Sequence, residues 1–278
     1  MLKDSEGGVW IGTYYNGVNY LPPYCGQFNG YSGSDEIPHF TSQIISRFCE
    51  DKNGNIWIAS DDSGLSCFNP STRQFVDFIG RNELKKKNQH ALCITEKNLW
   101  IGTYSDGILV LNTQTGKIKN YNITNGLDEN SIYSIFKDSK ERIWTGSMSG
   151  VCLYDSQTEH FTHIKNLDAL IIEITEDSKE NLWIATQGEG IFQYSPKQNK
   201  WKHYSKTKGL NCLNVNHLCI NRENQIWAAT SEGLYLYNPL KDTFEYQPLK
   251  VPNKCINAIL EGEDCLWLTT AKGLVKYT

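Results

Sequence analysis

The stretch "NLWIATQGEGIFQY" at residues 181–194 recurs along the chain with small changes. Close variants are "NIWIASDDSGLSCF" at 55–68, "NLWIGTYSDGILVL" at 98–111 and "QIWAATSEGLYLY" at 225–237. A catalytic motif normally occurs once in a chain, whereas a motif that recurs many times is typical of a repeated structural unit. The repeat therefore decides the fold.

Seven tryptophans mark the repeated unit. The steps between them are 47, 43, 44, 39, 44 and 40 residues, a mean of about 43, which is the range of propeller blades and helical solenoids. Each unit reads as short β-rich runs separated by turn residues, without a sustained 3.6-residue period, and this pattern excludes helical repeats. The tryptophans are Trp10, Trp57, Trp100, Trp144, Trp183, Trp227 and Trp267.

The fourth unit predicts four strands per repeat. Residues 132–136 alternate, and "IWTGS" (143–147), "VCLYD" (151–155) and "HFTHI" (160–164) follow after turns. Four antiparallel strands make one propeller blade, so the predicted fold is all-β. We expect a seven-bladed β-propeller of four-stranded antiparallel blades that forms a single domain over residues 1–278.

The two end units are shorter than the others. The first begins at the turn "KDSEGG" and the last ends at "GLVKYT", so the first and last blades are expected to be incomplete. Three, twenty and three strands give an expected total of 26. We therefore expect this chain to be a fragment of a larger protein.

The repeated residue types have physical reasons. A tryptophan ring fills the space between neighbouring blades. The carboxylates of Asp51, Asp138 and Asp177, six residues before a tryptophan, are expected to brace the turn after the first strand. Glycines six or seven residues after each tryptophan are expected to supply a positive φ at the hairpin loop. They are Gly17, Gly64, Gly107, Gly150, Gly190, Gly233 and Gly273.

Composition and charge limit the function classes. Hydrophobic residues make up 39% and charged residues 21%, with a mean hydropathy of −0.48, as in ordinary soluble globular proteins. The net charge of −4 gives no electrostatic case for nucleic-acid binding, and the run Lys85–Lys87 indicates a solvated loop. No apolar run approaches the roughly 20 residues of a membrane span, and no signal peptide is visible.

The nine cysteines include no C-x-x-C pair, so neither a zinc site nor another metal site is predicted. Cys49 and Cys219 lie eight residues before their tryptophans, where Phe136 lies in another unit. We expect both thiols to be buried and protected from oxidation.

The repeat resembles the two-component regulator propeller. The best match is "EDKNGNIWIASDDSGLSCFNPSTRQFVDF" at residues 50–78, and the resemblance covers essentially the whole chain. "GGVWIGTYYNGVNYLPP" at 7–23 is similar to the blade that opens the second propeller of hybrid two-component sensors of gut bacteria. Departures are confined to single turns, such as "CITEKNLW" in the third unit, which lacks the usual Asp and Gly.

The resemblance implies a location and a function. In that family two seven-bladed propellers form a periplasmic sensor, which an immunoglobulin-like domain, a membrane helix, a histidine kinase and a receiver follow. These sensors detect oligosaccharides and switch on glycan-utilisation genes. The chain is thus expected to be the periplasmic, ligand-sensing part of an inner-membrane sensor kinase. Expected partners are an oligosaccharide, the other domains of the sensor and a second copy in a homodimer, but not nucleic acid.

Enzyme motifs are absent from the sequence. It contains no H-E-x-x-H, no G-x-S-x-G and no Walker loop, and Glu189 in "TQGEG" has no second carboxylate beside it. His160 and His163 flank Phe161 on the predicted outer strand, where plain surface residues are expected. We predict that this chain is not an enzyme and has no cofactor, because the kinase domains of the family would lie outside it.

Binding residues are expected on the loops between second and third strands. In a blade these loops leave the same face as the connections from fourth to first strands. Aromatic faces beside amides and carboxylates suit a sugar, whose C–H face stacks while its hydroxyls form hydrogen bonds. Trp201 aligns with Phe75 and Phe161 and is interpreted as core packing. The candidate ligand-binding residues are Tyr14, Tyr15, Asn16, Asp61, Asp62, Tyr104, Asp106, Gln187 and Glu189.

Two alternatives stay open. The chain could be a protein-interaction or dimerisation propeller without a small ligand, which would show a large apolar patch on one face. It could also be a propeller enzyme such as a lyase or glycosidase, which would need acids or a metal site converging in the central channel.

Overall fold

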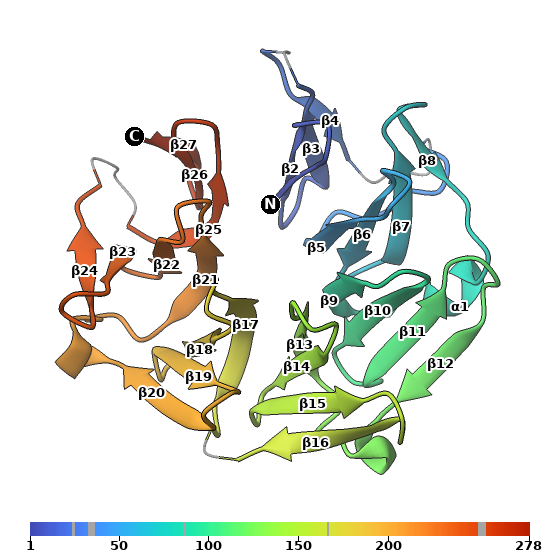
Figure 1. The fold of residues 1–278 in the computed structure, drawn as a ribbon. Coiled ribbons are helices and arrows are strands. Elements are labelled where there is room, and N and C mark those ends of the chain that lie inside the picture. The colour runs from blue at the N-terminus through green and yellow to red at the C-terminus, as the bar shows by residue number, and fades with distance from the viewer. Residues whose placement is uncertain (24–25, 33–36, 86, 166, 250–253) are drawn as a thin grey trace. The chain divides into compact units, whose positions relative to one another are not determined.

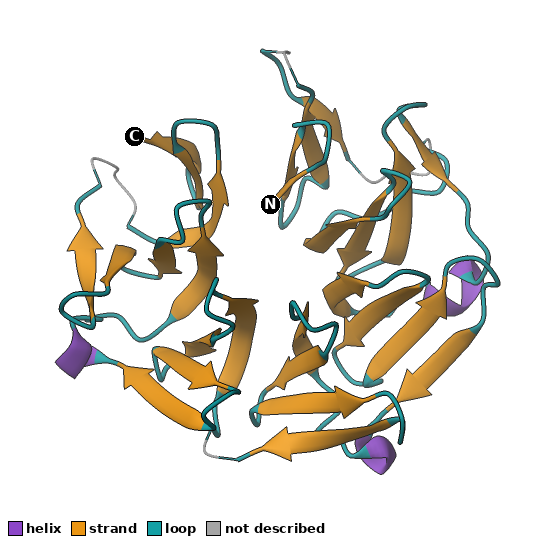
Figure 2. Cartoon of the chain, in the orientation of Figure 1, coloured by secondary structure: helices purple, strands orange, loops and turns teal. Residues whose placement is uncertain are grey.

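Strands dominate the chain. The computed structural model describes every residue except 24–25, 33–36, 86, 166 and 250–253, so Cys25 and Lys86 lie outside the described residues. Helical segments in the described part are short: α1 (Arg81–Leu84), η1 (Ile123–Asn125) and η2 (Lys206–Lys208) (Figure 2). None of these segments has the length and apolar character that a membrane-crossing helix needs.

The first of two compact units, Met1–Ile135, contains three complete sheets whose strands follow one another in chain order (Figure 1). The first sheet consists of β1 (Leu2–Lys3), β2 (Val9–Gly12), β3 (Val18–Leu21) and β4 (Asn29–Tyr31). The second consists of β5 (Ile45–Glu50), β6 (Ile56–Ser60), β7 (Gly64–Asn69) and β8 (Gln74–Val76). The third consists of β9 (Gln89–Ile94), β10 (Asn98–Thr103), β11 (Ile108–Asn112) and β12 (Ile118–Tyr121).

The second unit, Phe136–Thr278, contains the remaining sheets, and the boundary falls inside β13 (Ile132–Lys137). After β13 its sheet continues with β14 (Ile143–Ser147), β15 (Val151–Asp155) and β16 (His160–Ile164). The fifth sheet is β17 (Leu170–Glu176), β18 (Leu182–Gln187), β19 (Ile191–Ser195) and β20 (Lys200–Tyr204). The sixth is β21 (Val215–Ile220), β22 (Ile226–Thr230), β23 (Gly233–Asn238) and β24 (Thr243–Gln247). The last is β25 (Ile256–Glu261), β26 (Leu266–Thr270) and β27 (Gly273–Tyr277).

The fold is the predicted seven-bladed β-propeller of four-stranded antiparallel sheets, with three strands in the last blade. One detail of the expectation is wrong: the first blade does have a first strand, because Leu2 and Lys3 pair with Trp10 and Val9. The described residues therefore contain 27 strands rather than 26. The extent of a single domain over residues 1–278 stays a prediction.

The hairpin glycines have the predicted backbone conformation. All seven glycines that follow the repeat tryptophans have a positive φ, from 68° at Gly17 to 145° at Gly233. At Gly64 an added Cβ would lie 2.0 Å from the backbone oxygen of Leu84, so this position also needs the missing side chain.

Five of the repeat tryptophans, Trp10, Trp57, Trp144, Trp183 and Trp227, lie in apolar cores between neighbouring sheets. In the first unit the ring of Trp10 stacks on Tyr20, at 4.1 Å between centroids, and meets Phe68 of the next sheet edge-on at 5.0 Å. In the second unit Trp183 meets Tyr237 of the next sheet at 4.9 Å. The indole therefore fills the space between sheets, as predicted.

An aspartate anchors the indole in four sheets. The Nε1–H group of the tryptophan donates to the carboxylate six residues earlier over 2.8–3.0 Å: Trp10 to Asp4, Trp57 to Asp51, Trp144 to Asp138 and Trp183 to Asp177. The other carboxylate oxygen braces the turn, as Asp177 Oδ1 accepts from the backbone N–H groups of Lys179 and Asn181 at 2.9 Å each. We call this arrangement the Trp–Asp clasp.

In the fourth sheet the hydrogen bonds of the clasp favour the ionised form of Asp138. Burial by itself raises the pKa of Asp138, but the hydrogen bonds from Trp144 and from the backbone and side chain of Arg142 outweigh it. The pKa of Asp138 therefore lies below its ordinary value. A charged acceptor makes a stronger hydrogen bond to the indole than a neutral one would.

The sixth sheet lacks the clasp. Asn221 replaces the aspartate, and its side chain is bonded to Gln225 through the backbone N–H at 2.8 Å and the side-chain oxygen at 2.7 Å. The Nε1 atom of Trp227 is buried and has no hydrogen-bond partner among the described residues. A buried donor without an acceptor lowers stability.

Cys49 and Cys219, which were expected to be buried, are both half-buried in the structure. Their thiols are nevertheless protected by their surroundings. Burial raises the pKa of Cys49 well above its ordinary value and the pKa of Cys219 to about 12. The reactive thiolate form is therefore disfavoured at both positions.

Exchanging Asp and Asn at the clasp position should change the free energy of unfolding in opposite directions in the fifth and sixth sheets. Asn221→Asp supplies an acceptor for Trp227 and should raise the free energy of unfolding by about 1 kcal/mol. Asp177→Asn should lower it by about 1–3 kcal/mol, since the indole of Trp183 then faces an amide. Urea unfolding at neutral pH followed by tryptophan fluorescence measures both changes. Two changes of the same sign would contradict this role of the carboxylate.

Candidate ligand-binding site

The loops chosen from the sequence lie beside the connections between sheets, as predicted. In the first unit Gly17, on the loop after β2, donates its backbone N–H to the oxygen of Gln43, at 3.1 Å. The backbone N–H of Asp61, on the loop after β6, bonds the oxygen of Ile44 at 3.0 Å. Residues 43–44 belong to the connection that leads into β5, so one connection links two hairpin loops.

Two of the predicted aspartates are used inside the protein. Asp62 accepts a hydrogen bond from the Ser42 hydroxyl at 2.7 Å and from the Gln43 backbone N–H at 2.9 Å. Asp106 forms an ion pair with Lys87, with 2.6 Å between carboxylate oxygen and Nζ. These carboxylates hold the loops in place, which leaves them less capacity to bind a ligand.

Asp61 and Tyr104 are brought together around a histidine that the sequence did not single out. His90, on β9, places Nε2 at 3.5 Å from Asp61 Oδ1, and both atoms are buried without a hydrogen-bond partner among the described residues. The ring centroid of His90 lies 6.0 Å from that of Tyr104 and 5.1 Å from that of Tyr133. We call Asp61, His90, Tyr104 and Tyr133 the His90 cluster.

Electrostatics favour a neutral imidazole in the His90 cluster. Burial lowers the pKa of His90, the carboxylate of Asp61 acts in the opposite direction, and Arg47 lowers it further, so the net shift is downward. Burial also raises the pKa of Tyr133, with smaller contributions from Tyr104, Glu129 and Asp61. At neutral pH the cluster therefore offers hydrogen-bonding groups and ring faces with little positive charge.

Three of the predicted tyrosines offer open ring surface. The exposed fractions of Tyr14, Tyr15 and Tyr104 are 63%, 68% and 52%, which is unusual for rings of this size. Tyr14 and Tyr15 pack edge-on at 4.6 Å, and Asn16 is held by its backbone N–H, which donates to Thr13 Oγ1 at 2.9 Å. Such rings can stack on the apolar face of a sugar.

Gln187 and Glu189 lie in the second unit and are exposed: Gln187 ends β18, and Glu189 lies on the loop between β18 and β19. The backbone oxygen of Glu189 lies 2.6 Å from Nε2 of His203, and Gln187 forms an isolated bridge with Asn214. In the same unit Trp201 is half-buried and stacks on Tyr194 at 4.6 Å against the core of the fourth and fifth sheets, as its alignment predicted.

Comparisons with known proteins support the repeat assignment. Residues 39–62 and 126–149 match the family described as Two component regulator propeller, which confirms the resemblance found in the sequence. No curated protein sequence matches the chain. The chain therefore contains two-component regulator propeller repeats.

Solved structures with similar folds include several bacterial proteins. The extracellular domain of a proposed hybrid two component system from B. thetaiotaomicron has a TM-score of 0.84 at 22% identity over 100% of this chain and 38% of its own. A second extracellular domain from this organism, of a proposed one component system, has a TM-score of 0.83 at 23% identity over 99% and 37%. Virginiamycin B lyase from Staphylococcus aureus has a TM-score of 0.79 at 12% identity over 99% and 92%.

These similarities define the fold. The chain spans less than two fifths of the length of the two extracellular domains. It aligns with nearly all of the lyase, so one propeller of this size occurs both inside larger extracellular domains and as an enzyme.

Acid should destabilise the protein through His90. Its pKa is lower in the folded than in the unfolded state, so the unfolded state binds more protons as the pH falls below about 6.5, and stability decreases there. His90→Gln should show a smaller loss of unfolding free energy between about pH 8 and pH 5.5. Urea unfolding across this range measures the difference. Equal losses in the two proteins would contradict a buried neutral His90.

Proposed function

We propose that the chain is a ligand-sensing propeller from the extracytoplasmic part of a hybrid two-component sensor kinase. The repeat match at two separate blades supports this proposal, together with the fold similarity to extracellular domains of two-component systems. In a sensor of this kind the propeller would lie in the periplasm and the kinase domains would lie elsewhere in the protein. Ligand binding would shift the equilibrium between arrangements of the propellers or of a dimer.

The proposed ligand is an oligosaccharide. The observation that carries this choice is the exposed ring surface of three tyrosines in the first unit: Tyr14 and Tyr15 pack together and precede Asn16, and Tyr104 belongs to the His90 cluster. Flat rings next to hydrogen-bonding side chains match the two faces of a pyranose. Asp61 of the cluster faces His90 rather than a second carboxylate, whereas a glycosidase normally uses a pair of carboxylates, so binding without catalysis fits this site better than hydrolysis does.

Binding should depend on the open tyrosine faces. Isothermal titration of the chain against a panel of plant and host oligosaccharides should reveal micromolar affinity for one class. Tyr104→Ala should weaken that affinity about tenfold, which corresponds to about 1.4 kcal/mol, since a stacking surface is removed. Tyr246→Ala, at an exposed tyrosine of β24 in the second unit, serves as the matched control and should bind normally.

Absence of binding to every oligosaccharide by the well-folded chain would contradict the proposal. It would favour the protein-interaction alternative, in which this propeller contacts another domain or a second copy. Release of an unsaturated or shortened sugar during incubation would instead favour the lyase or glycosidase alternative.

A further inference from the structure

The fifth sheet departs from the repeat at one position that faces a neighbouring sheet. The residue paired with the repeat tryptophan on the third strand is Gln193, opposite Trp183. The five other four-stranded sheets carry an uncharged, largely apolar side chain at this position: Tyr20, Cys67, Val110, Leu153 and Leu236. The last sheet, which has three strands, carries Lys276 there. Among the four-stranded sheets, Gln193 is therefore the residue at this position that carries an amide.

The same row of the fifth sheet continues with a second polar residue. Gln193 pairs with Lys202 on β20. The corresponding fourth-strand residue is also polar in four other sheets, at Asn29, Lys119, Thr162 and Glu245, and is apolar at Val76 of the second sheet. The departure is therefore at Gln193, whose long polar side chain replaces a less polar one between the outer strands of the fifth and sixth sheets. The space beside Gln193 and Lys202 is hollow, and this hollow is larger than the pocket of about 290 Å³ beside Cys67 and Val76 of the second sheet.

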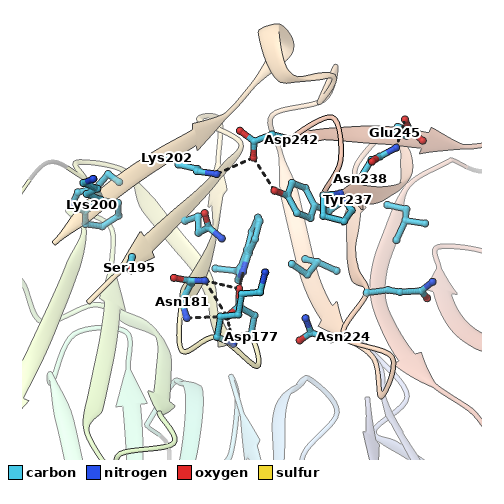
Figure 3. A pocket seen from close by; sticks show the side chains of 18 of the residues that line it. Asp177, Asn181, Ser195, Lys200, Lys202, Asn224, Tyr237, Asn238, Asp242 and Glu245 are labelled. Atoms are coloured by element: carbon cyan, nitrogen blue, oxygen red, sulfur yellow. Dashed lines mark hydrogen bonds and ion pairs between the residues drawn. The ribbon is translucent and has the colours of Figure 1, made fainter. Parts of the chain in front are cut away.

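The hollow has a volume of about 1020 Å³ and lies wholly within the second unit. Figure 3 shows Ser195, Lys200 and Lys202 on one wall, with Tyr237 and Asn238 of β23 facing them. We call it the Gln193 hollow. Its volume reaches the upper end of the range found for small-molecule pockets, about 300–1000 Å³.

The rim of the Gln193 hollow is fixed by Asp242. Its carboxylate accepts hydrogen bonds from the hydroxyls of Tyr204 and Tyr237 at 2.8 Å each, and from Lys202 at 3.1 Å and Lys208 at 3.0 Å. Burial alone raises the pKa of Asp242, but these four donors outweigh it and hold the pKa well below the ordinary value. The carboxylate stays ionised and joins the two sheets at this point.

The base of the hollow is equally well ordered. The Trp–Asp clasp of Trp183 and Asp177 lies there, and Asn181 adds a hydrogen bond from Nδ2 to Asp177 Oδ2 at 3.0 Å (Figure 3). Both ends of the hollow are thus held by charged hydrogen bonds. A preformed site loses little entropy when a ligand binds.

The walls keep unused hydrogen-bonding groups. The side chains of Gln193, Gln198 and Lys200 line the hollow and have no hydrogen-bond partner among the described residues. The charged side chains of the lining are close to balance, with three lysines and four carboxylates: Lys179, Lys200, Lys202, Asp177, Glu223, Asp242 and Glu245. Amides and balanced charges suit a ligand with many hydroxyls and no net charge better than an anion or an apolar molecule.

We propose that the Gln193 hollow is a second carbohydrate subsite, which binds a short neutral oligosaccharide between β19–β20 and β23. This inference rests on the proposed sensing function and extends it to a surface away from the tyrosine loops of the first unit. A volume of about 1020 Å³ holds two or three sugar rings. Gln193 supplies both a donor and an acceptor to the ligand hydroxyls.

The test uses hydrogen–deuterium exchange of the chain with saturating maltotriose, cellotriose or mannotriose, and with a sulfated disaccharide as the charged comparison. One neutral trisaccharide should slow exchange in residues 191–204 and 233–242. Gln193→Leu, which introduces the residue found at Leu153 and Leu236, should abolish this protection and weaken binding there at least tenfold. Its melting temperature should equal or exceed that of the natural chain, and Gln193→Ala provides a second variant.

A double variant, Tyr14→Ala with Tyr104→Ala, separates the two sites. It should keep the protection of residues 191–204 and lose only binding at the loops. If the double variant loses all binding while Gln193→Leu loses none, the Gln193 hollow is not a subsite, although the sensing function stands. Protection by the sulfated disaccharide alone would overturn the neutral class. If no sugar binds the natural chain, the proposed function and the subsite fail together.

Discussion

The hydrogen bond from a buried indole to an aspartate six residues earlier is the constraint on which each clasped sheet depends. The aspartate carboxylate braces the turn and accepts the indole N–H group, and the indole ring contacts the neighbouring sheet. A tryptophan with a free Nε1–H could fill the same volume, but at the cost of a buried donor. In the sixth sheet the indole of Trp227 is buried without this hydrogen bond, whereas the four clasped sheets have it.

Much of the fold could be predicted from the sequence because the repeat supplies independent copies of the same information. The strands at 143–147, 151–155 and 160–164 have the predicted bounds, and the hairpin glycines have the expected φ. The two-residue strand β1 was missed because two residues carry no periodicity. Asp4 was missed as a clasp residue because its unit begins too close to the chain start for an aligned strand.

The candidate site was less predictable, for a physical reason. Loop position can be inferred from a repeat, but the partner of each side chain depends on neighbouring sheets. Asp61, Asp62 and Asp106 occupy similar loop positions in the sequence. In the structure Asp62 accepts a hydrogen bond from Gln43, Asp106 pairs with Lys87, and Asp61 lies beside His90. His90 gave no motif, since its role comes from rings more than ten residues away. The alignment of repeats shows that Gln193 differs from its counterparts in the other four-stranded sheets. The strand register was needed to show which space between sheets its side chain faces.

The braced turns also bear on the order in which the protein acquires its structure. In each clasp the hydrogen bonds join residues that are two to six positions apart, as at Asp51 and Trp57. Closing such short loops costs little chain entropy, whereas contacts between sheets join segments about forty residues apart. We therefore expect the hairpins of the first two strands to form early and separately, and the indole cores to assemble afterwards. Folding of this kind would proceed by stepwise addition of blades along the chain.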